Sequence, residues 1–306
     1  MKRLLYCAFG VVAFGALLVR PAAADKLRVV ATFSVIGDMV ANVAGDQVDL
    51  VTIVGPDGDC EEYEPTAADV PKLAGARILF MNGLNDDFEP WLPGLMKQAK
   101  FNGTKVIVTR GVRALSAEDE HPAGGKAKAS VLDQHAWMNP RNGIIYVKNV
   151  TEALVRADPA NADTYHNRAA SYIQQLRDLA KWTAAAIDEV PVAKRRVLAS
   201  HDSLQYLGYA FGITLISVNG WTNKSEPSAA DLARLTDQIR RERVKALFLD
   251  SITDPRAMER ISKETGAVVG GTLYGDALSP PGGPAGTYID MIRHDVTTLK
   301  AGMLLN

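Results

Sequence analysis

Residues 163–190, near the middle of the chain, have the sequence DTYHNRAASYIQQLRDLAKWTAAAIDEV. A helix is predicted here because apolar or small side chains recur at alternating spacings of four and three, which places them on one helix face. They are Tyr165, Ala169, Tyr172, Leu176, Leu179, Thr183, Ala186 and Val190. Pro191 follows and ends the helix. At 1.5 Å rise per residue the helix would be about 40 Å long, which favours a stiff connector between two lobes over a crossover helix inside one domain.

Short apolar, β-branched runs flank this helix on both sides, with helical stretches between them. Such alternation is typical of parallel sheets built from β-α units. Four runs fall in each half of the chain, so the predicted α/β fold has two (β/α)4-type lobes with parallel sheets, joined by the long rigid helix. The runs are residues 27–33, 48–54, 78–81 and 106–108 in the first half, and 196–199, 213–218, 246–249 and 268–273 in the second.

The first 24 residues are predicted to be a secretory signal peptide. Lys2 and Arg3 precede an apolar stretch at 4–19, and three alanines precede Asp25, which gives the charged start, apolar middle and small-residue cleavage site of such a signal. A membrane anchor is the alternative, but the stretch is shorter than the roughly 20 residues that a spanning helix needs. The remaining chain then divides into an N-terminal lobe at 25–160, the linker helix at 161–190 and a C-terminal lobe at 191–306.

Charge and cysteine content narrow the classes of partner. Without residues 1–24 the chain carries 31 basic and 35 acidic side chains, a formal net charge of −4, and no basic patch, so we expect no nucleic-acid partner. Cys60 is the one cysteine outside the predicted signal, which excludes an internal disulfide. Cys7 lies inside the signal, too early for a lipid-attachment cysteine at the cleavage point.

Four candidate metal ligands follow predicted strands or lie in neighbouring loops: Glu61, His135, His201 and Asp276. Open α/β sheets bind ligands beyond the carboxyl ends of their strands, and two candidates come from each half, so we expect a site between the lobes. Imidazole is the commonest protein metal ligand at neutral pH. Two neutral imidazoles and two carboxylates offset a divalent charge and suit zinc. Manganese or ferrous iron would accept the same set.

Each candidate also has a simpler interpretation when taken alone. His201 and Asp202 resemble the start of a helix, where Asp202 would be either an N-cap or a group that orients His201. Asp276 beside glycine is a common turn residue, Glu61 is one of several acids on a loop, and His135 would be a histidine in a surface turn. The metal site is favoured because all four residues follow predicted strands or lie in neighbouring loops, and are unlikely to do so by accident.

No other catalytic set is recognised, so the protein is predicted not to be an enzyme. Ser200, His201 and Asp202 have the residue types of a hydrolase triad, but neighbours on a strand point to opposite faces. The alternative is a secreted zinc-dependent hydrolase with Glu62 or Asp202 as the general base.

Several segments resemble the solute-binding proteins of bacterial zinc and manganese ABC importers, the cluster A-I or ZnuA/TroA-like family. The similar segments are VATFSVIGD at 30–38, YEPT at 63–66 with Asp69, DQHAW at 133–137, SHD at 200–202 and LYGDAL at 273–278. The tail at 283–294 is similar to the AztC-type zinc-binding branch. The resemblance implies periplasmic, monomeric capture of metal between the lobes and its transfer to an ABC permease driven by a cytoplasmic ATPase. A periplasmic metallochaperone is a further candidate partner.

The resemblance transfers His135, His201 and Asp276 as metal ligands, but the family usually has histidine where this chain has Glu61. Three alternatives follow for the fourth position: Glu61 as an oxygen ligand, which we prefer, then water, then Cys60 as a thiolate deprotonated by the metal. Zinc is the preferred ion and manganese the alternative.

Two further segments are of interest. Residues 114–130 carry no periodicity and are predicted to form an exposed, mobile loop, in which His121 is more often solvated than a metal ligand. Trp221 follows the predicted strand at 213–218, in a loop that would face the cleft. It would either shield the site or cap the core.

Overall fold

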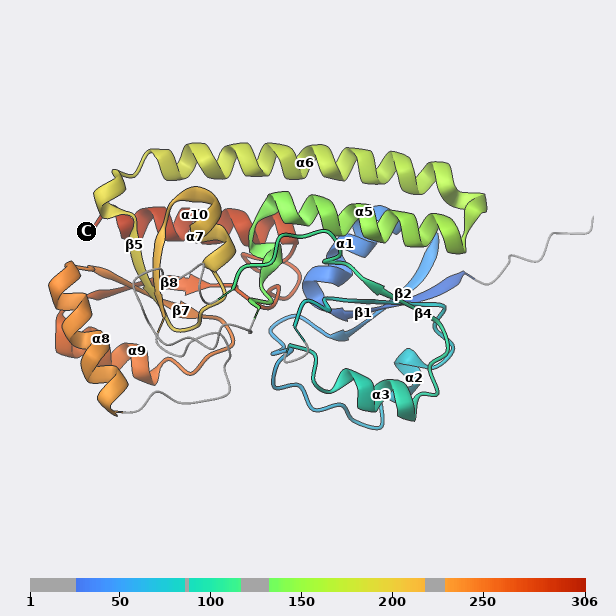
Figure 1. Cartoon of the computed structure of the whole chain (residues 1–306), viewed down its shortest axis with the longest axis horizontal. Coiled ribbons are helices and arrows are strands. Elements are labelled where there is room, and N and C mark those ends of the chain that lie inside the picture. The colour runs from blue at the N-terminus through green and yellow to red at the C-terminus, as the bar shows by residue number, and fades with distance from the viewer. Residues whose placement is uncertain (1–25, 86–87, 117–131, 218–228) are drawn as a thin grey trace, which may run out of the picture.

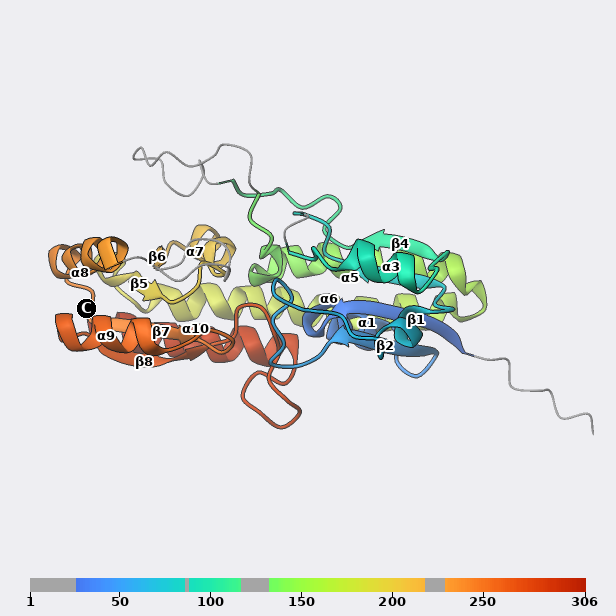
Figure 2. The same cartoon turned by 90° about the horizontal axis from the view of Figure 1, so that it is seen from below.

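The computed structural model describes residues 26–85, 88–116, 132–217 and 229–306. The predicted signal peptide, most of the loop at 114–130 with His121, and Trp221 lie outside the described residues. Two lobes lie side by side, and one long helix runs along both of them in each view (Figures 1 and 2). None of the helices in the described ranges is long and apolar enough to cross a bilayer.

Each lobe is built on a parallel four-stranded sheet, which confirms the predicted fold class. The sheet orders are β2-β1-β3-β4 and β6-β5-β7-β8, so both lobes have the same topology. The strands of the first sheet are β1 (Leu27–Phe33), β2 (Val48–Val54), β3 (Ile78–Met81) and β4 (Thr104–Ile107). Those of the second are β5 (Arg196–Ala199), β6 (Thr214–Ser217), β7 (Ala246–Asp250) and β8 (Val268–Leu273).

Helices cover the sheets and connect successive strands (Figure 1). The N-terminal half contains α1 (Ser34–Ala44), α2 (Val70–Leu73), α3 (Leu92–Gln98) and α5 (Pro140–Ala157). The C-terminal half contains α7 (Gln205–Phe211), α8 (Ala229–Glu242), α9 (Arg256–Thr265) and α10 (Tyr288–Met303). A single turn, η1 (Ala136–Met138), precedes α5, and the short turns η2 (Pro159–Asn161) and η3 (Val192–Lys194) flank the long helix.

The first sheet differs from the prediction at its edge. β4 begins at Thr104 and ends at Ile107, whereas the apolar run predicted a strand at 106–108. Thr104 and Lys105 are exposed, yet they pair with Ile78 and Leu79 of β3. An edge strand has one side open to solvent and therefore tolerates polar side chains, so hydrophobicity alone does not mark where it starts.

A β-bulge sets the register at the end of the second sheet. Val269 pairs with Leu247, but the next pair is Gly271 with Phe248, so one residue of β8 is skipped. Gly271 has φ +148, and a Cβ there would lie 2.6 Å from Thr298 of α10, which only glycine avoids. The bulge fixes how β8 leaves the sheet and therefore where the loop that follows Leu273 begins.

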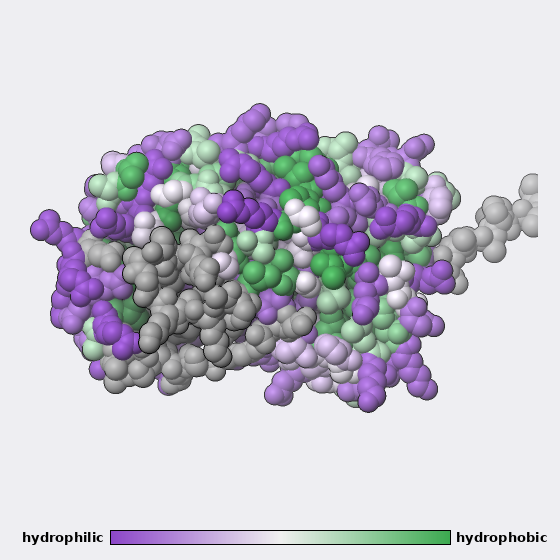
Figure 3. Space-filling model, viewed as in Figure 1, coloured by the Kyte–Doolittle hydropathy of each residue, from purple (hydrophilic) through white to green (hydrophobic). Residues whose placement is uncertain are grey.

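The long helix α6 (Ala162–Asp188) packs against both lobes. It contacts α1 and α5 on one side of the molecule and α7 and α10 on the other. Its buried residues are Tyr165, Ala169, Tyr172, Leu176, Leu179, Ala180, Thr183, Ala186 and Ile187. They include every residue of the predicted apolar face except Val190, which follows the helix. Hydrophilic residues gather along the opposite, outer edge (Figure 3). A helix anchored in this way restrains the relative motion of the lobes.

Asp38 of α1 joins the two lobes beneath this helix. It accepts hydrogen bonds from the Tyr172 hydroxyl of α6 at 3.2 Å and from the Tyr288 backbone N–H of α10 at 3.2 Å. Burial raises the pKa of Asp38. Three elements from both halves of the chain thus meet at one carboxyl group.

Leu176 offers a test of how much α6 contributes to stability. It is fully buried in the middle of the helix, so Leu176→Ala is expected to lower the free energy of unfolding by about 2–5 kcal/mol through lost contacts and a cavity. The adjacent, exposed Arg177 is the control, because surface changes usually stay within about 0.5 kcal/mol. Denaturant titration measures both. Equal, small effects would show that α6 is not packed as described.

Candidate metal centre

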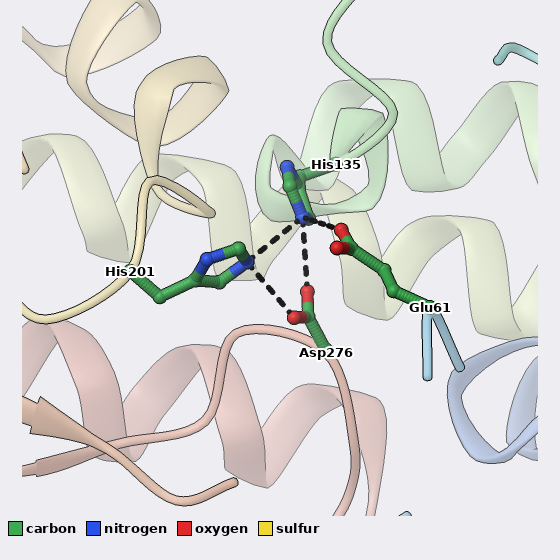
Figure 4. Close-up of side chains that lie close together, drawn as sticks. All are labelled: Glu61, His135, His201 and Asp276. Atoms are coloured by element: carbon green, nitrogen blue, oxygen red, sulfur yellow. Dashed lines mark hydrogen bonds and ion pairs between the residues drawn. The ribbon is translucent and has the colours of Figure 1, made fainter. Parts of the chain in front are cut away.

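The structure brings all four predicted side chains together between the lobes (Figure 4). Glu61 lies in the loop after β2, and His135 directly precedes η1. His201 follows β5, and Asp276 follows β8. Each residue offers one ligand atom, these atoms lie within 4.8 Å of one another, and all four residues are buried. Two ligand atoms therefore come from each lobe.

Asp276 lies between the two imidazoles. Its Oδ1 is 3.1 Å from His135 Nε2, and its Oδ2 is 3.0 Å from His201 Nε2. The two Nε2 atoms are 3.3 Å apart, and Glu61 Oε1 is 3.8 Å from His135 Nε2. Both histidines thus present the same ring nitrogen to the same point, from opposite lobes.

This arrangement fits a cation. Both carboxylate oxygens of Asp276 are buried, and within the described ranges neither has a hydrogen-bond partner of good geometry. The ion-pair distances to the imidazoles are short, so the oxygens must face the space between the side chains. Buried polar atoms without partners are costly, and two ring nitrogens aimed at one point repel each other whether both carry lone pairs or both carry protons. A divalent ion at that point would satisfy all of these atoms.

When no metal is bound, protons on the two histidines take over part of the role of a cation in the site. Burial alone would lower the pKa of His201, but the charge of Asp276, its short polar contact with the ring and the charge of Asp250 together outweigh burial and raise this pKa to about 9. Burial likewise opposes the charges of Asp276 and Asp133 at His135, and its pKa lies well above the usual value. Burial would raise the pKa of Asp276, but the two imidazoles hold it below its usual range. A metal bound by both histidines would therefore compete with protons for their ring nitrogens.

Asp133 orients His135, a role that the sequence did not reveal. Its Oδ1 accepts from the His135 backbone N–H at 2.8 Å and lies 2.7 Å from the ring Nδ1. A proton on Nδ1 then leaves Nε2 free for the metal. In the sequence, the one sign of this role was that Asp133 lies two residues before the candidate ligand His135. Asp202, in contrast, accepts from Gln205 Nε2, and α7 begins at Gln205 with Leu204 as its N-cap. Within the described residues His201 Nδ1 has no hydrogen-bond partner, so Asp202 is observed neither as an N-cap nor as a group that orients His201.

Aromatic rings enclose the lobe-1 side of the site. The Trp137 ring centroid is 5.3 Å from that of His135, and Phe88 lies 6.3 Å from it. Trp137 and Met138 are fully buried beside His135. A dry surrounding strengthens electrostatic interactions within the site.

The loop that carries Glu61 points the side chains of Cys60 and Glu61 in different directions. The backbone N–H of Glu61 donates to Asp59 Oδ1 at 2.8 Å, and the Cys60 carbonyl accepts from Trp91 Nε1 at 2.8 Å. Cys60 is fully buried in the first-lobe core, and burial raises the pKa of its thiol well above the usual value. These contacts aim Glu61 at the other ligands and Cys60 at the core.

The loops of Asp276 and His135 are also held by the opposite lobe. Trp137 Nε1 of lobe 1 donates to the Gly275 carbonyl, next to Asp276, at 2.8 Å. Conversely, the Tyr206 hydroxyl of α7 donates to the Asp133 carbonyl at 3.0 Å. A side chain at Gly275 would collide with Ser203 and Asp250 of the second lobe, so glycine is required where this loop packs against its own lobe.

Leu278, two residues after Asp276, makes a second contact between the lobes. Its backbone N–H donates to Ser34 Oγ at 3.0 Å, and its carbonyl accepts from the Asp57 N–H at 2.9 Å. Ser34 begins α1 and Asp57 lies in the loop that leads to Glu61. The loops of Glu61 and Asp276 are therefore joined to each other directly.

The sequence matches the family described as "ZnuA: Zinc-uptake complex component A periplasmic" over residues 29–302. The chain belongs to this family. It is a metal-binding component of an ABC transporter and not an enzyme, as the resemblance implied. Membership of the AztC-type branch stays a prediction.

Its relatives differ in the metal that their names give. The iron ABC transporter substrate-binding lipoprotein MtsA of Streptococcus pyogenes is 31% identical over 288 residues, which cover 93% of this chain and 91% of MtsA. The Mn-bound periplasmic metal-binding protein of Candidatus Liberibacter asiaticus is 30% identical, with a TM-score of 0.79 over 91% of this chain and 100% of that one. The periplasmic zinc-binding protein TroA of Treponema pallidum is 27% identical, with a TM-score of 0.82 over 91% and 99%.

Tyr206 tests the link between the His135 loop and the opposite lobe. Besides donating to Asp133, its hydroxyl accepts from the Leu115 N–H at 2.9 Å, so Tyr206→Phe leaves a buried N–H without this partner and should cost about 1–3 kcal/mol of stability. We expect metal to dissociate several-fold faster, because His135 is less restrained. Stopped-flow transfer of metal to a chelator measures the rate.

The matched control is Tyr165→Phe, which removes the same atom from a buried tyrosine bonded to Asp158, away from the site. It should leave the dissociation rate unchanged. The same acceleration in both variants would mean that Tyr206 acts through general stability alone.

Proposed function

We propose that this protein captures zinc in the periplasm through Glu61, His135, His201 and Asp276 and delivers it to an ABC permease driven by a cytoplasmic ATPase. The observation that carries the proposal is the convergence of four buried ligand atoms within 4.8 Å, two from each lobe. In the same proposal the signal peptide at 1–24 is removed and the mature protein acts as a monomer. A periplasmic metallochaperone is a candidate donor of the metal.

The donor set supports zinc over manganese. Two zinc ligands at about 2.0–2.1 Å in tetrahedral geometry are about 3.3–3.4 Å apart, and the two Nε2 atoms are separated by 3.3 Å. Two carboxylates and two neutral imidazoles balance a divalent charge. Manganese is the second candidate, because carboxylates suit it and one relative of known structure is named as Mn-bound.

Glu61 is the proposed fourth ligand. The loop contacts aim it at the other three side chains, whereas Cys60 lies in the core with a raised thiol pKa. A thiolate ligand would require the loop to rotate out of its hydrogen bonds with Asp59 and Trp91. Water is the remaining alternative for this position.

Binding and release follow from the contacts between the lobes. Capture requires the ion to lose its water and both histidines to lose their protons. Release requires the ligand atoms of one lobe to separate from those of the other, which first breaks hydrogen bonds such as those of Trp137 and Tyr206. Since α6 packs on both lobes, we propose that the permease disturbs the ligand loops and does not force a wide hinge opening.

Native mass spectrometry of the mature protein isolated from periplasm tests this proposal. We expect one zinc ion per chain, and competition experiments should show tighter binding of zinc than of manganese. Glu61→His should keep the stoichiometry because imidazole restores a nitrogen donor. A protein that is isolated without metal and binds neither ion on addition would refute the proposal.

A further inference from the structure

Gln134, the residue before His135, connects the two proposed ligands of the first lobe. It is fully buried, and its Nε2 donates to Glu61 Oε1 at 2.5 Å. Glu61 Oε1 is also the oxygen that lies 3.8 Å from His135 Nε2. The amide of Gln134 therefore contacts a carboxylate oxygen at the edge of the site without itself belonging to the group of ligand atoms.

Neighbouring groups fix the direction of this hydrogen bond. Asn85 Nδ2 donates to the backbone carbonyl of Leu132 at 2.9 Å and to Gln134 Oε1 at 3.2 Å. A carbonyl only accepts, so the NH₂ group of Asn85 must point toward Leu132. Gln134 Oε1 is then an acceptor, and its NH₂ group must be the one that faces Glu61. The amide cannot flip without leaving two acceptors in contact.

The backbones of both partners are anchored as well. The Gln134 carbonyl accepts from Asn82 Nδ2 at 3.0 Å, and Asn82 Oδ1 accepts from the Tyr146 hydroxyl at 2.9 Å. Asp59 holds the Glu61 N–H at 2.8 Å. Glu61 and Gln134 thus meet as two restrained groups, and their hydrogen bond limits how the carboxylate can turn.

This restraint affects the number of oxygens that Glu61 can give. A carboxylate binds a metal through one oxygen or chelates it through both. The N–H of Gln134 occupies one direction at Oε1 and draws electron density from it, which disfavours symmetric chelation. Four-coordinate zinc needs one donor from each of four residues, whereas manganese favours more oxygen donors and octahedral geometry.

On the basis of the proposed function, we propose that Gln134 is a positioning residue that makes Glu61 a one-oxygen ligand and thereby sets the preference for zinc over manganese. Gln134→Met keeps the length of the side chain and removes the donor. Groups that orient metal ligands typically contribute 10–100-fold to metal affinity. We therefore expect the zinc-to-manganese affinity ratio to fall at least tenfold in this variant.

Gln205→Met is the matched control. Gln205 is also buried and donates through Nε2 to a carboxylate, that of Asp202, which is not among the proposed ligands. Both variants lose one amide–carboxylate bond, so both should lose stability, but only Gln134→Met should change the ratio. In a Glu61→His background, Gln134→Met should leave the ratio unchanged, because an imidazole offers the metal one donor in any orientation.

Chelator competition with Zn²⁺ and Mn²⁺ gives the affinities, and the visible absorption of the Co²⁺-loaded protein reports the coordination number. Strong bands of four-coordinate cobalt in the wild type that weaken in Gln134→Met would support the role. An unchanged ratio, or an equal loss of both affinities, would overturn it while leaving the proposed function intact. A wild type that binds neither metal would refute both.

Discussion

Asp276→Asn is expected to weaken zinc binding several hundredfold. Asp276 contacts both imidazoles, at 3.1 and 3.0 Å, and it supplies one of the two negative charges of the proposed site. Four ligands of a structural zinc site together contribute roughly 10–16 kcal/mol, so one of them carries about 2.5–4 kcal/mol, and each 1.4 kcal/mol is about tenfold in affinity. The amide is nearly isosteric, so the loss reports charge and donor strength.

The control for this variant is Asp295→Asn. Asp295 is another fully buried carboxyl group of the second lobe, which accepts from the Tyr274 N–H at 3.0 Å. Burial disfavours its charged form and raises its pKa well above the usual value, and asparagine has nearly the shape of the uncharged carboxyl group. We expect zinc affinity within threefold of wild type. If Asp276→Asn bound zinc with less than a tenfold loss, Asp276 would not be a ligand.

The sequence was sufficient to predict the two lobes, because most strands are runs of largely apolar residues that are buried in the sheets. β1 and β5, for example, lie at the predicted residues. Asp276 was placed correctly beside His201 because both follow such strands and the carboxyl ends of parallel strands meet at one edge. The edge strand β4 was misplaced because Thr104 and Lys105 are polar.

Contacts that depend on distant residues could not be predicted in the same way. Tyr206 bonds to the Asp133 carbonyl across 73 positions, and no local pattern of charge or hydrophobicity marks such a pair. Gln134 lies inside a recognised segment, but its neighbour Glu61 is 73 residues away. The four candidate ligands were therefore accessible from sequence, whereas contacts such as those of Tyr206 and Gln134 with residues far along the chain required coordinates.

Zinc affinity is expected to fall steeply with acidity, by up to about a hundredfold per pH unit below neutrality. Metal binding must displace protons from His135 and His201, whose pKa values are both raised, that of His201 from 6.5 to about 9. The raised pKa values favour protonated rings in the metal-free protein, so we expect each bound zinc to release up to two protons. Asp276 contributes none, since the imidazoles hold its pKa below the usual range.

The stability of the metal-free protein should fall as the pH rises, whereas the zinc affinity should rise. The folded-state pKa of His201 exceeds the unfolded value, so its contribution to stability is complete below about pH 6.5 and is lost as the pH rises through about 9. We therefore expect the Tm of the metal-free protein to fall over this range. Zinc stabilises the folded state by an amount that grows with affinity, so the difference in Tm between zinc-loaded and metal-free protein should widen with rising pH.

Proton release measured in weakly buffered solution and zinc affinity measured from pH 6 to 8 check both effects. His201→Gln should remove about one of the two protons and halve the pH slope, while His166→Gln, at an exposed position of α6, should change neither. Affinity that is constant between pH 6 and 8 would mean that the imidazoles are already neutral before the metal arrives. Asp276 would then not be the charge that raises their pKa values, and the pairing of one carboxylate with two imidazoles across the lobes would have to be abandoned.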